Sequence, residues 1–237
     1  MNVLVVVGHK DDEVQGAAGA IAWHVANGDD VLAVCLTDGI GSRYTKAGTV
    51  PYWSQKFKHP QWQQEAIERE AAAEAAADSL GFTWLCHGDL PDNELDVYGI
   101  KNTAQWLAEQ VVNLEPDIIY TNYYADLNVD HRICYQAVRI VFRPIRGRKC
   151  CEIRCMEVPR ATEWCDPAHP FNPNVYVELT RELTEKKEKA LAAYYMELTA
   201  YPDLASNKAL DSLGRRRGCE AGVKFAEGFV SVRRLIT

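Results

Sequence analysis

The first forty residues predict a parallel βαβ unit, and this pattern restricts the fold more than any other feature of the chain. The apolar run Val3–Val7 is typical of a strand that is covered on both faces. Apolar residues then recur at helical spacing over residues 14–27, before a C-capping Gly28. A second apolar run covers residues 31–37. Because neighbouring parallel strands need a crossover connection, the pattern predicts an α/β fold with a mainly parallel sheet.

An acidic turn of sequence GHKDDE, residues 8–13, joins the first predicted strand to its helix. It brings one imidazole and three carboxylates to the carboxyl end of a parallel strand, where open α/β sheets bind ligands. No G-x-G-x-x-G pattern lies in this turn, and acids occupy the positions that would otherwise bind a phosphate. The turn therefore predicts a catalytic or metal site. The alternative is an acidic helix N-terminus that is favoured by the helix dipole.

The remaining chain continues to alternate strands and helices. We predict strands at 82–86, 117–121, 150–158, 175–179 and 229–236, and helices at 61–80, 100–113, 131–142, 181–198 and 209–225. Residues 40–60 form an aromatic-rich loop, either a substrate lid or an ordinary excursion, and residues 88–94 form a second loop. We expect a single domain over residues 1–237. Its predicted architecture is a Rossmann-like three-layer α/β fold with the site at the carboxyl edge of the strands.

The composition restricts the partners of the protein. The net charge of −7, from 26 basic and 33 acidic residues, disfavours a nucleic-acid surface. No apolar run approaches the roughly 20 residues that span a bilayer, and the N-terminus lacks the basic region of a signal peptide. We therefore expect a cytoplasmic protein that acts on a small molecule, with no nucleic-acid partner and no membrane span. A homo-oligomer stays open, because the aromatic loop offers an interface.

A second histidine completes a metal-ligating set with the first turn. His131 ends the sequence DLNVDH, residues 126–131, which follows the predicted strand at 117–121 and begins a helix. We expect it at the same edge of the sheet as His9 and Asp12. Two imidazoles and one carboxylate suit Zn²⁺, with Fe²⁺ or another divalent metal as the alternative. The other interpretation of His131 is a polar residue that merely starts a helix.

Neighbouring residues offer the other groups that such a centre needs. Asp11 can act as a general base without binding the metal, and Asp130 can orient a ligand histidine through its other ring nitrogen. Lys10 is interpreted as a solvated lysine, and the alternatives are that its charge lowers the pKa of Asp11 or contacts an anionic substrate. Candidate substrate contacts come from three loops and are Arg43, Tyr44, Asp92 and His169.

The same residues resemble the motifs of the PIG-L/LmbE-like de-N-acetylases over nearly the whole chain. The HPDDE-type motif corresponds to residues 9–13, and further similarities lie at 37–39, 92–93, 126–131, 171–174 and 225–229. The resemblance implies a zinc-dependent enzyme that removes acetyl from N-acetylglucosamine-type groups. It also implies that His9, Asp12 and His131 bind the metal and that Asp11 is the general base, in agreement with the analysis of the residues themselves.

Two positions depart from the family pattern. Lys10 replaces the usual proline, and Asn128 stands where many members have a histidine that stabilises the oxyanion or protonates the leaving amine. An asparagine can donate a hydrogen bond to an oxyanion but cannot serve as a general acid. The proton donor is then protonated Asp11 or, as a second candidate, His169.

We therefore expect a hydrolase that removes an N-acetyl group from an N-acetylglucosamine-type sugar or sugar conjugate. The nucleophile is a metal-activated water, and Asp11 is the general base. Two alternatives stay open. In the first, the same metal site hydrolyses another amide or hydrates a small acid. In the second, the chain is a catalytically degenerate sugar-binding module.

Overall fold

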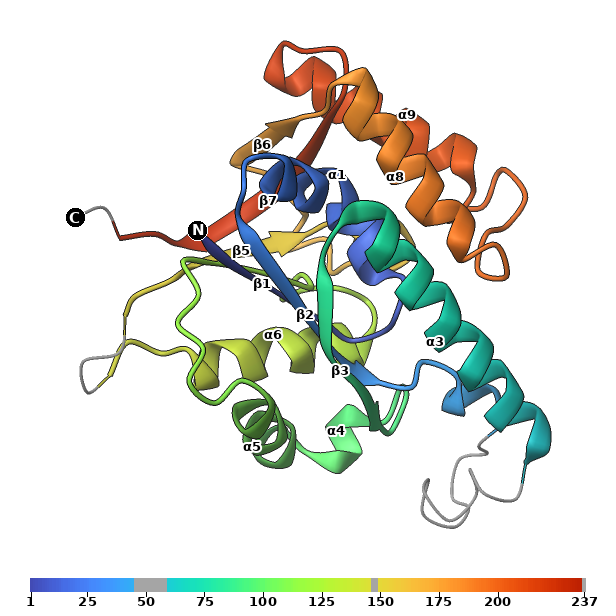
Figure 1. Ribbon diagram of the computed structural model, residues 1–237, viewed down its shortest axis with the longest axis vertical. Helices are drawn as coiled ribbons and strands as arrows, with labels where there is room; N and C mark the ends of the chain where they lie inside the picture. Colours follow the sequence, from blue (N-terminus) through green and yellow to red (C-terminus); the bar gives the residue numbers. More distant parts are fainter. Residues whose placement is uncertain (45–58, 146–148, 236–237) are drawn as a thin grey trace.

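The computed structural model describes residues 1–44, 59–145 and 149–235, which form a seven-stranded sheet with helices on both faces (Figure 1). The strands are β1 (Asn2–Val7), β2 (Asp30–Thr37), β3 (Thr83–Leu90), β4 (Ile118–Thr121), β5 (Glu152–Met156), β6 (Val175–Glu178) and β7 (Ala226–Arg233). The helices are α1 (Asp12–Ala26), η1 (Gly41–Arg43, a 3-10 turn), α3 (Pro60–Leu80), α4 (Leu95–Tyr98), α5 (Ile100–Gln110), α6 (Val129–Val141), α7 (Pro159–Thr162), α8 (Arg181–Ala193) and α9 (Asn207–Ala221). The predicted Rossmann-like α/β fold is confirmed. No helix within the described ranges combines the length and hydropathy needed to cross a lipid bilayer.

The order of the strands decides where a ligand can bind. The order is β3-β2-β1-β4-β5-β7-β6, with β1 to β5 parallel and β7 antiparallel to both of its neighbours. The sheet grows from β1 through β2 to β3 on one side, and then from β4 to β5 on the other. Ligands bind where the strand order reverses in this way, which here is between the carboxyl ends of β1 and β4. The turn at 8–13 follows β1 and the loop at 122–128 follows β4, so the topology brings the two predicted motifs together.

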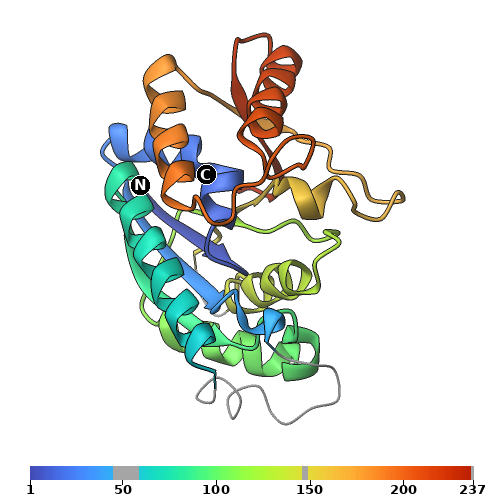
Figure 2. The same ribbon diagram turned by 90° about the vertical axis from the view of Figure 1, so that its right-hand side faces the viewer.

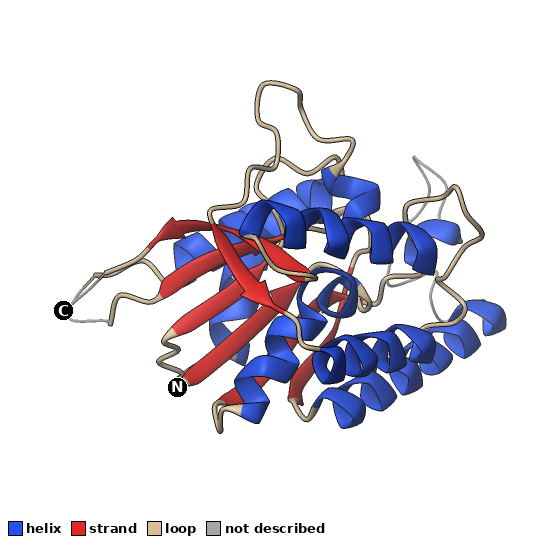
Figure 3. Ribbon diagram, turned by 90° about the horizontal axis from the view of Figure 1, so that it is seen from above, coloured by secondary structure: helices blue, strands red, loops and turns tan. Residues whose placement is uncertain are grey.

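Alternate residues of β1 enter two separate hydrophobic cores. Val3, Val5 and Val7 pack with residues of α1, α3 and α8 on one face of the sheet. Leu4 and Val6 pack with residues of α5 and α6 on the other face. Figure 2 shows α8 (orange) and α6 (yellow-green) on opposite sides of the strands, and Figure 3 shows the layers from above. The central strand is therefore covered on both faces, as its sequence predicts.

β3 is longer than the strand predicted at 82–86, whereas α8 ends at Ala193, five residues before the predicted end of that helix. The strand continues to Leu90 through part of the predicted loop at 88–94, because this stretch still pairs with β2 across two irregular steps in register. The short helices α4 and α7 were not predicted. Residues 45–58, which make up most of the predicted loop at 40–60, lie outside the described residues, so the choice between a substrate lid and an ordinary excursion stays open.

Gly88 provides a test of this longer strand. A Cβ atom there would lie 2.2 Å from the carbonyl oxygen of Leu36 and 2.5 Å from that of Cys35, so the backbones could not keep their spacing. We expect Gly88→Ala to lower the free energy of unfolding by about 1–3 kcal/mol, measured by urea denaturation.

Gly28→Ala is the control for this substitution. No atom lies within 4 Å of the added Cβ, and only the positive φ of 77° is unfavourable. A smaller loss of about 1 kcal/mol is expected there. Equal losses at Gly88 and Gly28 would contradict the close packing of β3 on β2.

Candidate active site

Three metal-ligating side chains converge at the carboxyl ends of β1 and β4. His9 Nδ1 lies 3.2 Å from His131 Nε2, which lies 3.2 Å from Asp12 Oδ2, and the third separation, His9 Nδ1 to Asp12 Oδ2, is 3.6 Å. A tetrahedral metal with bonds of about 2.0–2.1 Å separates neighbouring ligand atoms by roughly 3.3 Å. All three residues are buried. Their spacing and donor types therefore fit a divalent metal of the zinc class.

The other ring nitrogen of each histidine faces carboxylate oxygens. His131 Nδ1 lies 2.7 Å from Asp126 Oδ2, and His9 Nε2 lies 3.2 Å from Asp130 Oδ2 and 3.3 Å from Asp92 Oδ1. Such contacts fix the ring orientation and the tautomer of a metal ligand. Asp130 thus occupies the place expected from the sequence. The sequence analysis did not single out Asp126, although its position five residues before His131 was the available signal.

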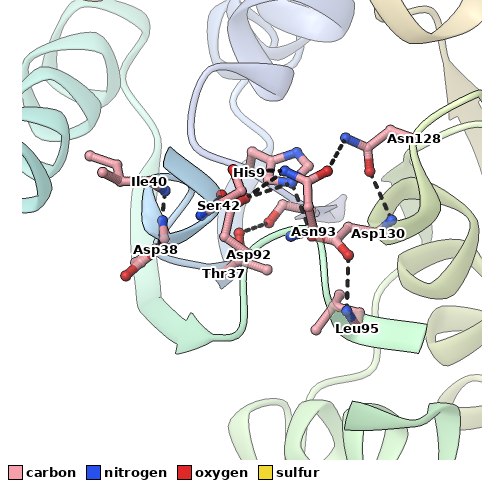
Figure 4. A network of polar contacts seen from close by, with 12 residues as sticks. His9, Thr37, Asp38, Ile40, Ser42, Asp92, Asn93, Leu95, Asn128 and Asp130 are labelled. Atoms are coloured by element: carbon pink, nitrogen blue, oxygen red, sulfur yellow. Dashed lines mark hydrogen bonds and ion pairs between the residues drawn. The ribbon is translucent and has the colours of Figure 1, made fainter. Parts of the chain in front are cut away.

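The loop after β3 fixes the position of His9. Asp130 accepts hydrogen bonds from the backbone N–H groups of Asn93 (2.6 Å) and Leu95 (3.1 Å), and Asp92 accepts one from Ser42 (2.9 Å; Figure 4). Asp92 was predicted to contact substrate, but its buried carboxylate is used by His9 and Ser42 instead. His9, Asp92 and Asp130 also form a second cluster of potential ligand atoms. Since Asp92 and Asp130 face Nε2 of His9 while its Nδ1 faces His131 and Asp12, we interpret this second cluster as a support for His9.

Asp12 is held in its charged form. Its Oδ2 accepts hydrogen bonds from the backbone N–H of His9 at 3.0 Å and from Asn122 Nδ2 at 2.9 Å. Burial favours the neutral carboxyl, but the charges and hydrogen bonds of His131 and His9 hold the pKa of Asp12 well below its ordinary value. Burial likewise opposes the charged imidazole of His131, yet Asp12 and Asp126 raise its pKa to about 9. Asn122, which the sequence analysis missed, also accepts the Gly8 N–H and so joins β4 to the turn.

Asp11 lies beside the ligand cluster and does not belong to it. Its backbone has φ 105° and ψ −23°, a conformation that costs a non-glycine residue about 1–3 kcal/mol and is most often found at functional sites. Arg69 Nη2 donates to Asp11 Oδ1 and Gln15 Nε2 donates to Asp11 Oδ2, both at 2.9 Å. Burial raises the pKa of Asp11 to about 6, although the charge of Arg69 opposes the rise.

Arg69 is the main site residue that the sequence analysis missed. It lies on α3, a helix from which the sequence analysis took no candidate site residue, and its side chain is buried. Its guanidinium donates to the carbonyl oxygen of Lys10 at 3.1 and 2.5 Å in addition to Asp11. Lys10, predicted to be solvated, is only 3% exposed. Burial raises the pKa of the Cys35 thiol, and the positive charge of Lys10 opposes this rise. The turn packs against α3, so Lys10, its third residue, is almost completely shielded from solvent.

Asn128 is engaged by its own helix. Its Oδ1 accepts the backbone N–H of Asp130 at 2.8 Å, which caps α6, and its Nδ2 donates to Asn93 Oδ1 at 3.0 Å. It does line the site, but both ends of its amide already have partners. The Asn93 hydrogen bond uses one of the two N–H donors of Nδ2, so the second N–H remains the donor for the predicted oxyanion contact.

Arg43 lines the mouth of the site, and two of the other predicted substrate contacts do not. Arg43 forms ion pairs with Glu65 at 3.2 Å and Glu197 at 2.9 Å. Tyr44 turns away, because its hydroxyl donates to Glu65 at 2.5 Å and its ring stacks on Trp62. His169 is exposed outside the site, where its carbonyl accepts from the Tyr123 hydroxyl. The structure therefore removes Tyr44 and His169 from the candidate site.

A cavity of about 570 Å³ opens over the ligand cluster. Its lining combines polar groups with a small apolar wall, and the residues that matter here are His9, Asp11, Arg43, Leu127, Val158, Ala161 and Glu197. A volume of this order lies within the range of small-molecule sites. The metal-ligating cluster, the Asp11 carboxylate and a space for a ligand thus share one cavity.

The fold and the site define an α/β protein with a candidate metal centre at the switch point of its sheet. The chain belongs to the PIG-L family: the family model described as GlcNAc-PI de-N-acetylase matches residues 4–142. The matched region runs from β1 through α6 and carries both halves of the centre. None of the curated proteins compared with the chain matches it in sequence.

Solved structures share this fold at low sequence identity. N,N'-diacetylchitobiose deacetylase from Pyrococcus horikoshii is 21% identical, with a TM-score of 0.70, over 98% of this chain and 83% of that one. The 4-carboxy-2-hydroxymuconate hydratase GalB from Pseudomonas putida KT2440 is 22% identical, with a TM-score of 0.70, over 100% and 98% of the two chains. Teicoplanin deacetylase Orf2 is 15% identical, with a TM-score of 0.72, over 99% and 100%. These similarities establish the fold.

The hydrogen bond between Asp126 and His131 provides a first prediction for the candidate metal centre. Asp126→Asn should weaken metal binding by about 10- to 100-fold, because the His131 ring loses the charge that orients it and raises its basicity. Isothermal titration calorimetry with Zn²⁺ measures the change. Asp166→Asn, a substitution in an exposed loop, is the control and should leave the affinity unchanged. An unaltered affinity in a folded Asp126→Asn protein would contradict the assignment.

The pH dependence of metal binding gives a second prediction. The pKa of His131 is about 9 in the metal-free protein, and a metal ligand has to be a neutral imidazole. Binding must therefore displace at least one proton below pH 9. We expect the zinc affinity to rise by about tenfold per pH unit for each displaced proton between pH 6 and 9. Calorimetry in buffers of different ionisation enthalpy counts these protons, and a flat affinity over this range would refute the prediction.

Proposed function

We propose that the protein is a divalent-metal-dependent hydrolase that removes the N-acetyl group from an N-acetylglucosamine-type sugar or sugar conjugate. The observation that carries the proposal is one cavity that holds a His9–Asp12–His131 ligand set and the separate Asp11 carboxylate. Membership of the PIG-L family, described as GlcNAc-PI de-N-acetylase, supports the reaction type. The donor set favours Zn²⁺, with Fe²⁺ as the principal competitor.

A metal held by His9, Asp12 and His131 would polarise the amide carbonyl and lower the pKa of a water molecule to about 7. The chain itself supplies the proton transfer. Asp11 is ionised in most molecules at neutral pH, because its pKa is about 6, so it can accept the proton of the attacking water. Arg69 and Gln15 each hold one oxygen of its carboxylate and limit its rotation.

The same Asp11 is also our candidate for the proton donor to the leaving amine. Asn128 has no titratable proton, and its amide is engaged with Asp130 and Asn93. His169 lies outside the cavity. Protonated Asp11 is then the titratable group best placed to return the proton. A carboxylate with a pKa near neutrality suits both directions of transfer.

The cavity fits a pyranose that carries a further group. One wall of the cavity is apolar and suits the hydrophobic face of a sugar ring; it is formed by Leu127, Val158 and Ala161. Arg43 also lines the cavity, where it could contact a group attached to the sugar. A volume of about 570 Å³ leaves room beyond one monosaccharide. These features support a sugar conjugate as substrate.

Hydration of a small acid is the second candidate function. The neighbour GalB, described as a 4-carboxy-2-hydroxymuconate hydratase, resembles the chain as closely in fold as the chitobiose deacetylase does. Acetate release from a panel of N-acetylated sugars tests the first function, and loss of the unsaturated-acid absorbance tests the second. Hydration without any acetate release would overturn the deacetylase proposal.

Asp11→Asn tests the mechanism. The amide keeps the size of the side chain but cannot accept the proton, so we expect kcat for acetate release to fall by about 10²- to 10⁴-fold. Zinc content, measured by elemental analysis, should stay the same because Asp11 is not among the ligands. Asp211→Asn, which removes a partly exposed carboxylate paired with Arg215 on α9 and does not line the cavity over the ligand cluster, is the matched control. Full activity in the zinc-loaded Asp11→Asn protein would exclude Asp11 as the base.

A further inference from the structure

The segment that follows α8 contacts Glu13 of the turn at residues 8–13 directly, and it also contacts Arg69 of α3, which itself binds the turn. The Tyr194 hydroxyl donates to Glu13 Oε1 at 2.6 Å, and the Glu197 carboxylate accepts from Arg69 Nη1. Tyr194 and Glu13 lie 181 positions apart in the sequence. Figure 1 shows α8 running beside both α1 and α3, the helices that carry Glu13 and Arg69.

The first contact reaches the backbone of Asp11. Glu13 Oε2 accepts the Asp11 N–H at 2.9 Å, while Tyr194 holds the other Glu13 oxygen. Both supporting side chains are almost completely buried, Glu13 at 0% and Tyr194 at 1% exposure. The hydrogen bond therefore stabilises Asp11 at its positive φ, which an aspartate without this partner would tend to leave.

The second contact reaches the side chain of Asp11. Arg69 offers Nη2 to Asp11 Oδ1 and to the Lys10 carbonyl, and it offers Nη1 to Glu197. A guanidinium presents its donors in a rigid plane, so a partner on one nitrogen sets the direction of the other. Glu197 is itself held by two hydrogen bonds from Arg43 Nη2, at 2.9 and 3.0 Å. The orientation of the Asp11 carboxylate thus depends on Arg69, and the orientation of Arg69 depends in turn on Glu197 in the segment after α8.

We propose that residues Tyr194 and Glu197 form a two-armed brace that positions the general base, acting through Glu13 on the backbone of Asp11 and through Arg69 on its carboxylate. Tyr194 and Glu197 are positioning residues, since neither contacts the reacting atoms. The expected changes in kcat rest on the proposed deacetylase function, whereas the positioning of Asp11 by the brace does not. A misplacement of a catalytic group by about 1 Å can reduce a rate by roughly 10²-fold, so a brace of this kind has a measurable effect.

Tyr194→Phe and Glu197→Gln separate the two arms with little change in size. We expect each to lower kcat for acetate release by about 5- to 50-fold with zinc content unchanged, and KM to stay within about twofold in Tyr194→Phe, which does not line the cavity. Glu65→Gln is the matched control. Glu65 also binds Arg43, but it has no contact with Arg69, so its loss should leave kcat within about twofold. Thermal unfolding of each variant establishes that it is folded.

Arg69→Ala distinguishes positioning from loss of structure. If the guanidinium only aims Asp11, added guanidinium chloride at low concentration should restore part of kcat in this variant and none in Asp11→Asn. Folded Tyr194→Phe and Glu197→Gln proteins with the kcat of Glu65→Gln would overturn the brace.

Crystal structures of Tyr194→Phe and Glu197→Gln test the brace without an activity assay. We expect Asp11 to leave the positive-φ region in Tyr194→Phe, and its carboxylate to rotate away from Arg69 in Glu197→Gln. If the wild-type protein released no acetate from any substrate, the proposed function would fail while these structures still tested the brace. An Asp11 with unchanged φ and an unchanged Arg69 contact in both variants would refute it.

Discussion

The burial of carboxylates around two histidines is the constraint on which the rest of the site depends. Five aspartates, Asp11, Asp12, Asp92, Asp126 and Asp130, are all at most 9% exposed at the same edge of the sheet. Charges removed from water at this density are stable only if each finds a cationic or hydrogen-bonding partner. The two histidines, Arg69 and the backbone N–H groups of the loop after β3 supply these partners. A bound divalent cation would add the largest positive charge at the point where the ligand atoms converge.

The partners of these buried carboxylates come from different parts of the chain. Pairing the buried charges therefore requires that these parts pack together in the tertiary structure. β1 and β4 bring the ligand histidines, α3 brings Arg69, and the segment after α8 brings Tyr194 and Glu197. The interior pairings are buried, where removing one partner leaves an uncompensated charge. The helices on one face of the sheet are therefore tied to the catalytic turn by charge as well as by apolar packing.

The separation of roles between adjacent residues follows from backbone geometry. Asp11 and Asp12 are neighbours, but Asp12 begins α1 and faces the histidines, whereas the positive φ of Asp11 turns its carboxylate toward Arg69. Their pKa values move in opposite directions, because His131 stabilises the charge of Asp12 while burial dominates at Asp11. One ligand and one base can thus be placed side by side without competing for the metal.

The sequence alone determined the alternation of strands and helices, the two-sided burial of β1 and the meeting of His9 with His131, because hydrophobic period and parallel strand order are properties of the linear pattern. It did not determine that Lys10 is buried, that Asp92 supports His9, or that Tyr44 and His169 point elsewhere. It also gave no sign that Arg69, one basic residue on a charged helix, would lie against Asp11. The contact of Arg69 with Asp11 joins residues 58 positions apart, and that of Tyr194 with Glu13 joins residues 181 positions apart, so they depend on how the helices pack on the sheet. Only the tertiary structure decides them, since no local propensity distinguishes a side chain that will be buried by a distant helix from one that stays in solvent.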